Sequence, residues 1–137
     1  GTDGQKMSKS YQNILDIFLS DKELKKNVNA IITDSTPLEE PKDPDTCTVF
    51  KLYSLMATPT QTHSLRAQYL AGNFGYGHAK KELFDLLVTR YAKEREQFDF
   101  FMNHPEEIEK RLLEGEAKAR LIALPLLNRV REKLGFL

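Results

Sequence analysis

The sequence has little that would tie it to a membrane, a metal or an oxidising compartment. Its 137 residues include a single cysteine, Cys47, which excludes an internal disulfide and argues against a metal site built on thiolates. No apolar run is long enough to span a bilayer, and no signal peptide is recognisable. We therefore expect a cytoplasmic protein with no membrane partner and no protein-bound metal.

The sequence also lacks an excess of charge of either sign. Lys and Arg together number 20, as do Asp and Glu, so the formal net charge at pH 7 is zero. No overall field attracts the chain to nucleic acid, so we expect no DNA partner, and any contact with RNA must be local. A content of 40% hydrophobic and 29% charged residues is ordinary for a globular domain that buries a core without disulfides.

The most informative stretch combines two lysines with two small hydroxyl residues. It consists of Lys6, Met7, Ser8, Lys9 and Ser10, and glycines precede it at positions 1 and 4. Two ammonium groups on flexible stems, beside hydroxyls and a freely rotating backbone, suit a phosphate chain whose geometry changes during a reaction. The alternative is a solvated basic turn, but average residue usage produces this string in roughly one in ten thousand chains of such length.

This stretch, the signature loop (residues 6–10), resembles the signature loop of class I aminoacyl-tRNA synthetases, which activate an amino acid with ATP. Three further landmarks are similar to the tryptophanyl branch of that family. They are Gly1-Thr2-Asp3-Gly4-Gln5, Thr33-Asp34-Ser35, and Gly75-Tyr76-Gly77 followed by Lys80. The landmarks span residues 1–80, and the helical remainder is compatible with the family in length and character.

The resemblance implies that L-tryptophan is activated with ATP to an adenylate and transferred to tRNA(Trp). Lys6 and Lys9 would stabilise transition-state charge, with Lys9 making the dominant phosphate contact, and Met7, Ser8 and Ser10 would complete the ATP-binding loop. ATP would be a substrate carrying Mg²⁺, and the full-length enzyme would be a homodimer. In the family, the element at 33–35 positions the signature loop, and the C-terminal helices bind the tRNA anticodon.

The nucleotide-binding half of such an enzyme is missing. The chain begins without Met, and it has neither a His-Ile-Gly-His-like motif nor a βαβ pattern. We therefore expect the C-terminal fragment of a longer ligase, inactive alone. Residues 1–12 would be the signature loop at the edge of the missing catalytic domain, and residues 13–137 the C-terminal helical domain.

The fold class predicted from apolar spacing is all-α, a bundle of about five or six helices without strands. Helical spacing begins at Asn13, and Ser20 with Glu23 has the form of a capping box for the next helix. Three prolines predict an irregular, mobile acidic loop at 33–45. Further helices are expected over 46–57, 62–71 and 78–103.

The last helix is predicted to run from Pro105 towards Gly135. Glutamates in its first turn and basic residues in its last complement the helix dipole, and Pro125 should kink or split it. Its inner row would be made of small and aliphatic residues: Ala117, Leu121, Leu124, Val130 and Leu134.

Some residues are candidates for contact with tRNA. The basic ones are Arg66, Lys80, Lys81, Arg129 and Arg131. Phe74 and Tyr76, in the glycine-rich turn, are expected to be hydrophobic plugs between helices, with stacking on an unpaired base as the alternative.

Two other functions fit part of the sequence. The tyrosyl or another class I synthetase has a similar signature loop, although the elements at 33–35 and 75–77 argue against the tyrosyl branch. A non-catalytic helical interaction module, whose Lys/Ser loop is accidental, is the second. It would have no nucleotide-binding fold upstream.

Overall fold

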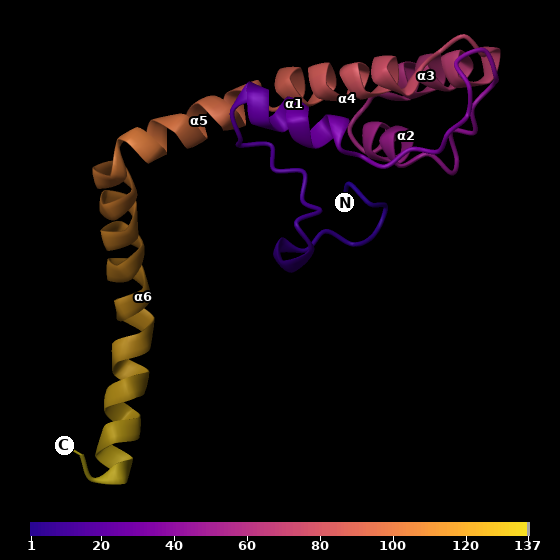
Figure 1. Ribbon diagram of the computed structural model, residues 1–137. Helices are drawn as coiled ribbons and strands as arrows, with labels where there is room; N and C mark the ends of the chain where they lie inside the picture. Colours follow the sequence, from indigo (N-terminus) through magenta and orange to yellow (C-terminus); the bar gives the residue numbers. More distant parts are fainter. Residues whose placement is uncertain (137) are drawn as a thin grey trace. The chain divides into compact units, whose positions relative to one another are not determined.

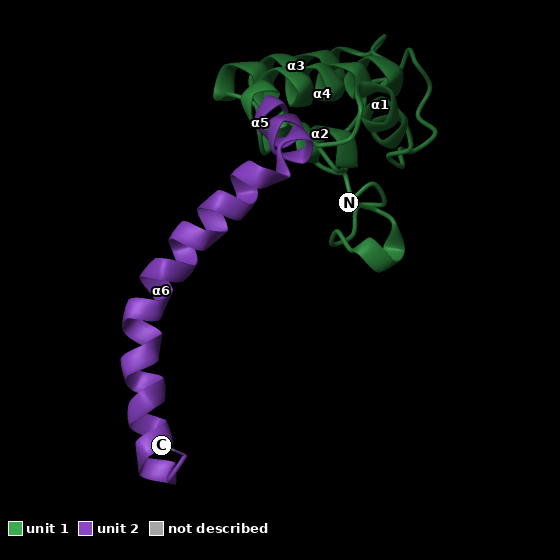
Figure 2. Ribbon diagram, turned by 90° about the vertical axis from the view of Figure 1, so that its left-hand side faces the viewer, with its two compact units in different colours: residues 1–95 green, residues 96–137 purple. Residues whose placement is uncertain are grey.

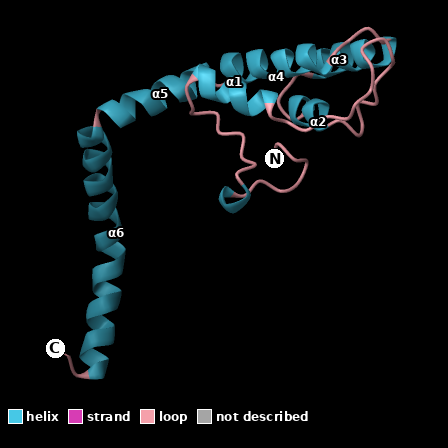
Figure 3. Ribbon diagram, in the orientation of Figure 1, coloured by secondary structure: helices cyan, strands magenta, loops and turns pink. Residues whose placement is uncertain are grey.

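The computed structural model describes residues 1–136, and every regular element in that range is helical (Figure 1). A short 3-10 helix, η1 (Lys9–Tyr11), precedes the α-helices. These are α1 (Asp21–Asn29), α2 (Thr48–Ser54), α3 (Pro59–Ala71), α4 (Tyr76–Arg90), α5 (Ala92–Asn103) and α6 (Pro105–Leu134). The prediction of five or six helices is confirmed, and Figure 3 shows helices and loops alone in the described part of the chain.

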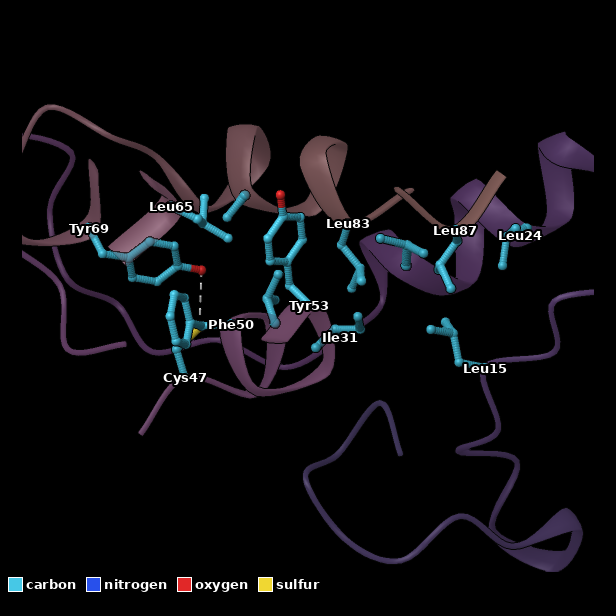
Figure 4. Packing of buried hydrophobic residues seen from close by; sticks show 13 residues of the cluster. Leu15, Leu24, Ile31, Cys47, Phe50, Tyr53, Leu65, Tyr69, Leu83 and Leu87 are labelled. Atoms are coloured by element: carbon cyan, nitrogen blue, oxygen red, sulfur yellow. Dashed lines mark hydrogen bonds between the residues drawn. The ribbon is translucent and has the colours of Figure 1, made fainter. Parts of the chain in front are cut away.

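Helices α1 to α4 pack around one hydrophobic core, in which α4 contacts α1 and α2, and α2 contacts α3. Figure 4 shows Leu83 and Leu87 of α4 in one cluster with Leu24 of α1 and Tyr53 of α2. Ile31, which follows α1, belongs to the same cluster. Fully burying a leucine side chain contributes roughly 1.5–3 kcal/mol relative to leaving it exposed. This shared cluster is therefore what holds the four helices together.

Local signals determine where two of these helices begin. At α1, the Ser20 hydroxyl accepts a hydrogen bond from the Glu23 amide (3.4 Å) and donates one to the Glu23 carboxylate (2.6 Å). At α3, Thr58 and Gln61 form a reciprocal capping box. Such pairs satisfy amide groups that have no partner inside the helix. The predicted cap of α1 is confirmed in its side-chain contacts.

The helix predicted to start at Asn13 does not form. Residues 13–16 have no regular structure, and at the following turn the Asp16 carboxylate accepts a hydrogen bond from the Phe18 amide (2.9 Å). Short polar side chains that bond nearby backbone groups in this way compete with helix formation. Leu15 is nevertheless buried, so this segment contributes to the core without being helical.

The long helix predicted over 78–103 is divided at Tyr91, whose φ of −103° and ψ of 20° leave the helical region. The apolar spacing stays in register across this residue, so it could not reveal a one-residue interruption. Just beyond it, the Arg95 guanidinium donates to the Ile17 carbonyl and pairs with Asp21 at 2.5 Å. These contacts tie the beginning of α5 to the segment around the start of α1.

The acidic loop at 33–45 is irregular as predicted, but a buried lysine holds its middle in place. Lys42 is only 2% exposed. Its ammonium group donates to three backbone carbonyls, those of Pro37 (2.8 Å), Leu38 (3.3 Å) and Glu40 (3.1 Å). Its backbone amide donates to the Tyr69 carbonyl in α3 (2.8 Å). These bonds offset the cost of burying the charge and connect the middle of the loop to α3. The mobility of the loop stays a prediction.

The chain divides into two compact units, residues 1–95 and 96–137 (Figure 2). In the second unit, α6 has Pro105 at its first position and Gly135, with φ of 74°, just past its end, as predicted. The helix continues through Pro125 and is not split there. Carbonyl groups freed by a proline reach water on an exposed helix, which lowers the penalty for continuing.

Neither α5 nor α6 contains a buried residue. The predicted inner row of α6 is exposed, with Leu121 at 79% and Leu134 at 66% of their full accessibility. The bundle prediction is therefore confirmed for α1 to α4, which share one core.

Candidate functional site

The signature loop presents both of its lysines to solvent. Lys6 and Lys9 are exposed, and within residues 1–136 neither takes part in a salt bridge. Lys9 is the first residue of η1, for which Ser8 is the preceding cap without a capping hydrogen bond from its side chain. Gln12 closes this turn with a positive φ of 52°, and its amide donates to the Lys9 carbonyl (3.3 Å). Two accessible ammonium groups thus lie on a structured loop.

Met7 is 42% exposed, yet part of its side chain faces the helical core. It lines an open, mainly apolar pocket of about 370 Å³, together with residues that include Leu15, Leu52 and Leu87. The same five-residue loop therefore exposes its charged side chains and places its apolar side chain against the hydrophobic side. This division suits a loop that binds an anion while remaining attached to the fold.

Asn13 closes the segment from residue 1 to residue 13, and the sequence analysis missed this role. Its side-chain oxygen accepts from the Ser8 amide (2.7 Å), and its Nδ2 donates to the Asp3 carboxylate (2.8 Å) and the Lys6 carbonyl (3.1 Å). Its backbone carbonyl accepts from the Thr2 amide (2.9 Å). Asn side chains are prone to such local bonds, which is the one signal that could have identified it.

Asp3 is the charged partner in this arrangement. The hydrogen bond from Asn13, aided by one from the Gln5 amide (2.9 Å), lowers the pKa of the Asp3 carboxyl. Gly1 packs against the same asparagine, because a Cβ at position 1 would overlap its carbonyl oxygen. Gly1, Thr2 and Asp3, which precede the signature loop, therefore all contact Asn13 and close the loop there.

The element at 33–35 is connected both to the segment before the signature loop and to the start of α4. The Ile32 amide, just before it, donates to the Thr2 carbonyl (2.8 Å). The Asp34 carboxylate accepts from the Thr36 amide (2.9 Å) and from the Tyr76 hydroxyl (2.8 Å), and these bonds lower the pKa of Asp34. Burial, together with the bond to Asp34, raises the pKa of Tyr76 to about 12. Two landmarks that are distant in sequence therefore meet directly.

Tyr69 of α3 is fully buried at the centre of an aromatic group. Its ring centroid lies 5.4 Å from that of Phe50, 5.6 Å from Phe74 and 6.4 Å from Tyr76. Its hydroxyl is 3.5 Å from the Cys47 sulfur (Figure 4), and burial raises its pKa. Phe74 and Tyr76 are partly buried against this core, so they are the hydrophobic plugs that were predicted.

Three of the candidate tRNA contacts have partners within the protein. Arg66 forms a bidentate pair with Asp45 (2.6 and 3.0 Å), and its guanidinium carbon is 5.0 Å from the centroid of the Phe50 ring. Lys80 donates to the Asn29 carbonyl (2.8 Å), and Lys81 pairs with Asp85 (2.5 Å). The other two candidates, Arg129 and Arg131, are exposed on α6.

Among residues 1–136, no group of three or more His, Cys, Asp and Glu side chains is arranged to hold a metal ion. In the same range, none of the helices combines the length and apolar character needed to cross a membrane.

Comparison with known proteins places the site in context. Residues 1–92 match the model of the family described as tRNA synthetases class I (W and Y). The chain is 44% identical over 135 residues to the tryptophan-tRNA ligase of Fusobacterium nucleatum. That alignment covers 98% of this chain and 41% of the ligase. It is 42% identical to the tryptophan-tRNA ligase of Campylobacter jejuni, with coverages of 98% and 42%.

A solved structure is also similar. The crystal structure of tryptophanyl-tRNA synthetase from Campylobacter jejuni complexed with ADP and tryptophan aligns with a TM-score of 0.95 at 42% identity. The alignment covers 98% of this chain and 42% of that one. The chain thus spans about two fifths of the length of the relatives it matches.

Proposed function

Because this chain belongs to the class I tRNA synthetases of the tryptophan and tyrosine group, we propose that it works as the C-terminal part of a tryptophan-tRNA ligase. The observation that carries the proposal is the signature loop, whose Lys6 and Lys9 are both exposed on a loop closed by Asn13. In this proposal residues 1–12 are the edge of an ATP-binding domain, residues 13–137 are the helical domain, and the segment alone is inactive.

The proposed reaction needs charge stabilisation more than acid-base catalysis. The tryptophan carboxylate attacks the α-phosphorus of ATP, a new C–O–P linkage forms, and pyrophosphate leaves with the electrons of the broken P–O bond. The tRNA 3′-terminal hydroxyl then attacks the carbonyl of the adenylate and releases AMP. Lys9 and Lys6 accelerate the first step if they bind the departing phosphates more strongly in the transition state than in the ground state.

The remaining partners follow from this chemistry. Met7, Ser8 and Ser10 shape the ATP contacts of the loop, and Mg²⁺ accompanies ATP as part of the substrate. L-tryptophan binds in the upstream domain, and tRNA(Trp) contacts the helical domain, where the anticodon-binding region would lie. The full-length enzyme would be a homodimer. It would be cytoplasmic, since translation supplies its tRNA substrate in that compartment.

The first test is amino-acid-dependent exchange of pyrophosphate into ATP by a full-length chain that contains these residues. We expect exchange with tryptophan and none with tyrosine. Exchange with tyrosine or another amino acid alone would move the assignment to a different class I synthetase. An absence of exchange with every amino acid would favour a non-catalytic interaction module.

The second test replaces Lys9. We expect Lys9→Ala to reduce the exchange rate by about 100- to 1,000-fold, the range for losing one preorganised charge-stabilising group, while the affinity for tryptophan changes little. Lys25→Ala removes an equally exposed lysine from α1 and is the matched control. An undiminished rate in Lys9→Ala would refute the assigned role of the signature loop.

A further inference from the structure

Asn13, which directly follows residues 1–12, stands out because its polar side chain is buried. Asn13 is 2% exposed, whereas the signature-loop residues Lys6, Met7, Lys9 and Ser10 are all exposed. Both hydrogens of its amide nitrogen and the amide oxygen have partners within hydrogen-bond distance. A buried amide with every group satisfied specifies one arrangement of the chain around it.

We propose that Asn13 is a positioning residue that sets the geometry of the signature loop for the phosphate-binding step. This inference rests on the proposed function and extends it to a residue outside the loop. Asn13 touches no substrate. It acts through the backbone groups beside the two lysines, whose placement determines how well they meet the departing pyrophosphate.

The contacts of Asn13 fall next to both lysines. Its Nδ2 holds the carbonyl of Lys6 itself, and its Oδ1 holds the amide of Ser8, the residue before Lys9. The Ser8 amide is a donor, so the side-chain oxygen of Asn13 must face it, and this defines the orientation of the side-chain amide. The Ser8 side chain does not cap η1, so this bond fixes the entry to the turn that carries Lys9.

Residues near Asn13 also connect the signature loop to the hydrophobic core. Leu15, two positions later, is 8% exposed and belongs to the core cluster. The Thr2 amide donates to the Asn13 carbonyl (2.9 Å), and the Thr2 carbonyl accepts from the Ile32 amide (2.8 Å). Ile31, beside it, is 1% exposed. Asn13 thus lies where the signature loop connects to the helical core.

The test uses Asn13→Asp in the full-length ligase. The substitution keeps the shape and the acceptor for Ser8. It removes the donor to the Lys6 carbonyl and places a carboxylate opposite the Asp3 carboxylate. We expect kcat/KM for ATP in tryptophan-dependent exchange to fall about 100-fold, as for a catalytic group displaced by about 1 Å, with tryptophan affinity nearly unchanged. The melting temperature should fall as well, because the buried carboxylate has lost its donor role. Asn128→Asp, the same change at an exposed position of α6, is the control and should have no effect.

A compensating variant separates positioning from folding. In Asp3→Asn/Asn13→Asp, the amide of residue 3 again donates to the carboxylate of residue 13, and we expect about tenfold recovery of the rate as a coupled pair. Full activity of Asn13→Asp, or a loss of tryptophan binding as large as the loss of exchange, would overturn the inference, as would no recovery in the double variant. If Lys9→Ala abolishes exchange while Asn13→Asp does not, the proposed function stands and only the role of Asn13 fails.

Discussion

A single buried ammonium group organises the loop between α1 and α2. Besides its three carbonyl acceptors, the Lys42 Nζ lies 5.5 Å from the centroid of the Tyr76 ring. The Tyr76 hydroxyl in turn donates to Asp34, so the cation, the ring and the carboxylate form one connected group. A buried charge is tolerated when dipoles, a ring face and hydrogen bonds replace its water. This group connects the landmark at 33–35 to the start of α4.

We expect Lys42→Met to lower the free energy of unfolding by about 1–3 kcal/mol, because the apolar side chain leaves three loop carbonyls without their donor. Lys25→Met, at an exposed position of α1, is the control and should change stability by less than about 0.5 kcal/mol. Urea denaturation followed by circular dichroism measures both. Equal effects of the two substitutions would mean that the burial of Lys42 does not stabilise the loop.

At the scale of the elements, two glycines have opposite roles. Gly72 ends α3 with a φ of 73°, and a Cβ there would lie 2.5 Å from the Glu39 carbonyl oxygen. Gly115 is inside α6, and an added Cβ would meet no atom within 4 Å. Gly72 therefore allows the acidic loop to approach the end of α3, whereas Gly115 has no steric reason to be glycine.

The two glycines make a matched pair of substitutions. We expect Gly72→Ala to destabilise the protein by more than about 1 kcal/mol, because both the backbone conformation and the space exclude a methyl group. Gly115→Ala should instead stabilise α6 by roughly 0.5–1 kcal/mol, because alanine loses less entropy in a helix. Thermal unfolding measures the first, and amide exchange within α6 the second. A tolerated alanine at position 72 would contradict the close approach of Glu39.

At the scale of the whole molecule, stability is concentrated in the first unit. Every residue of the hydrophobic core lies between Leu15 and Leu87, and α5 and α6 contribute no buried side chain. Burial of apolar surface is the main favourable term in folding. The apolar burial that holds residues 1–95 together is therefore supplied by the side chains of the first unit itself.

Removal of residues 96–137 tests this distribution. We expect the truncated chain to retain the free energy of unfolding of the first unit to within about 1 kcal/mol, since the deletion touches no buried group. Arg95 is kept because it contacts Ile17 and Asp21. Urea titration of the two chains, monitored by tyrosine fluorescence, makes the comparison. Loss of cooperative unfolding on truncation would show that the second unit supports the first.

Several features could be predicted from the sequence because they depend on residues within one turn. Ser20 with Glu23, and Gly135 after α6, mark helix ends through bonds or backbone angles that neighbouring residues determine. The signature loop was singled out by its residue types and spacing, and its role in binding ATP stays a prediction. Asn13, three positions after it, was missed because the apolar spacing of the following residues predicted a helix there.

The sequence by itself determined the helical class, the start of α1, both ends of α6 and the residues of the signature loop, since local hydrogen bonds and apolar spacing are properties of adjacent residues. Only the tertiary structure decided that Asn13 and Lys42 are buried, that Asp34 meets Tyr76, and that the apolar row of α6 is exposed. These outcomes depend on which distant segments lie against one another. Whether a polar side chain is solvated or buried therefore depends on the tertiary packing around it.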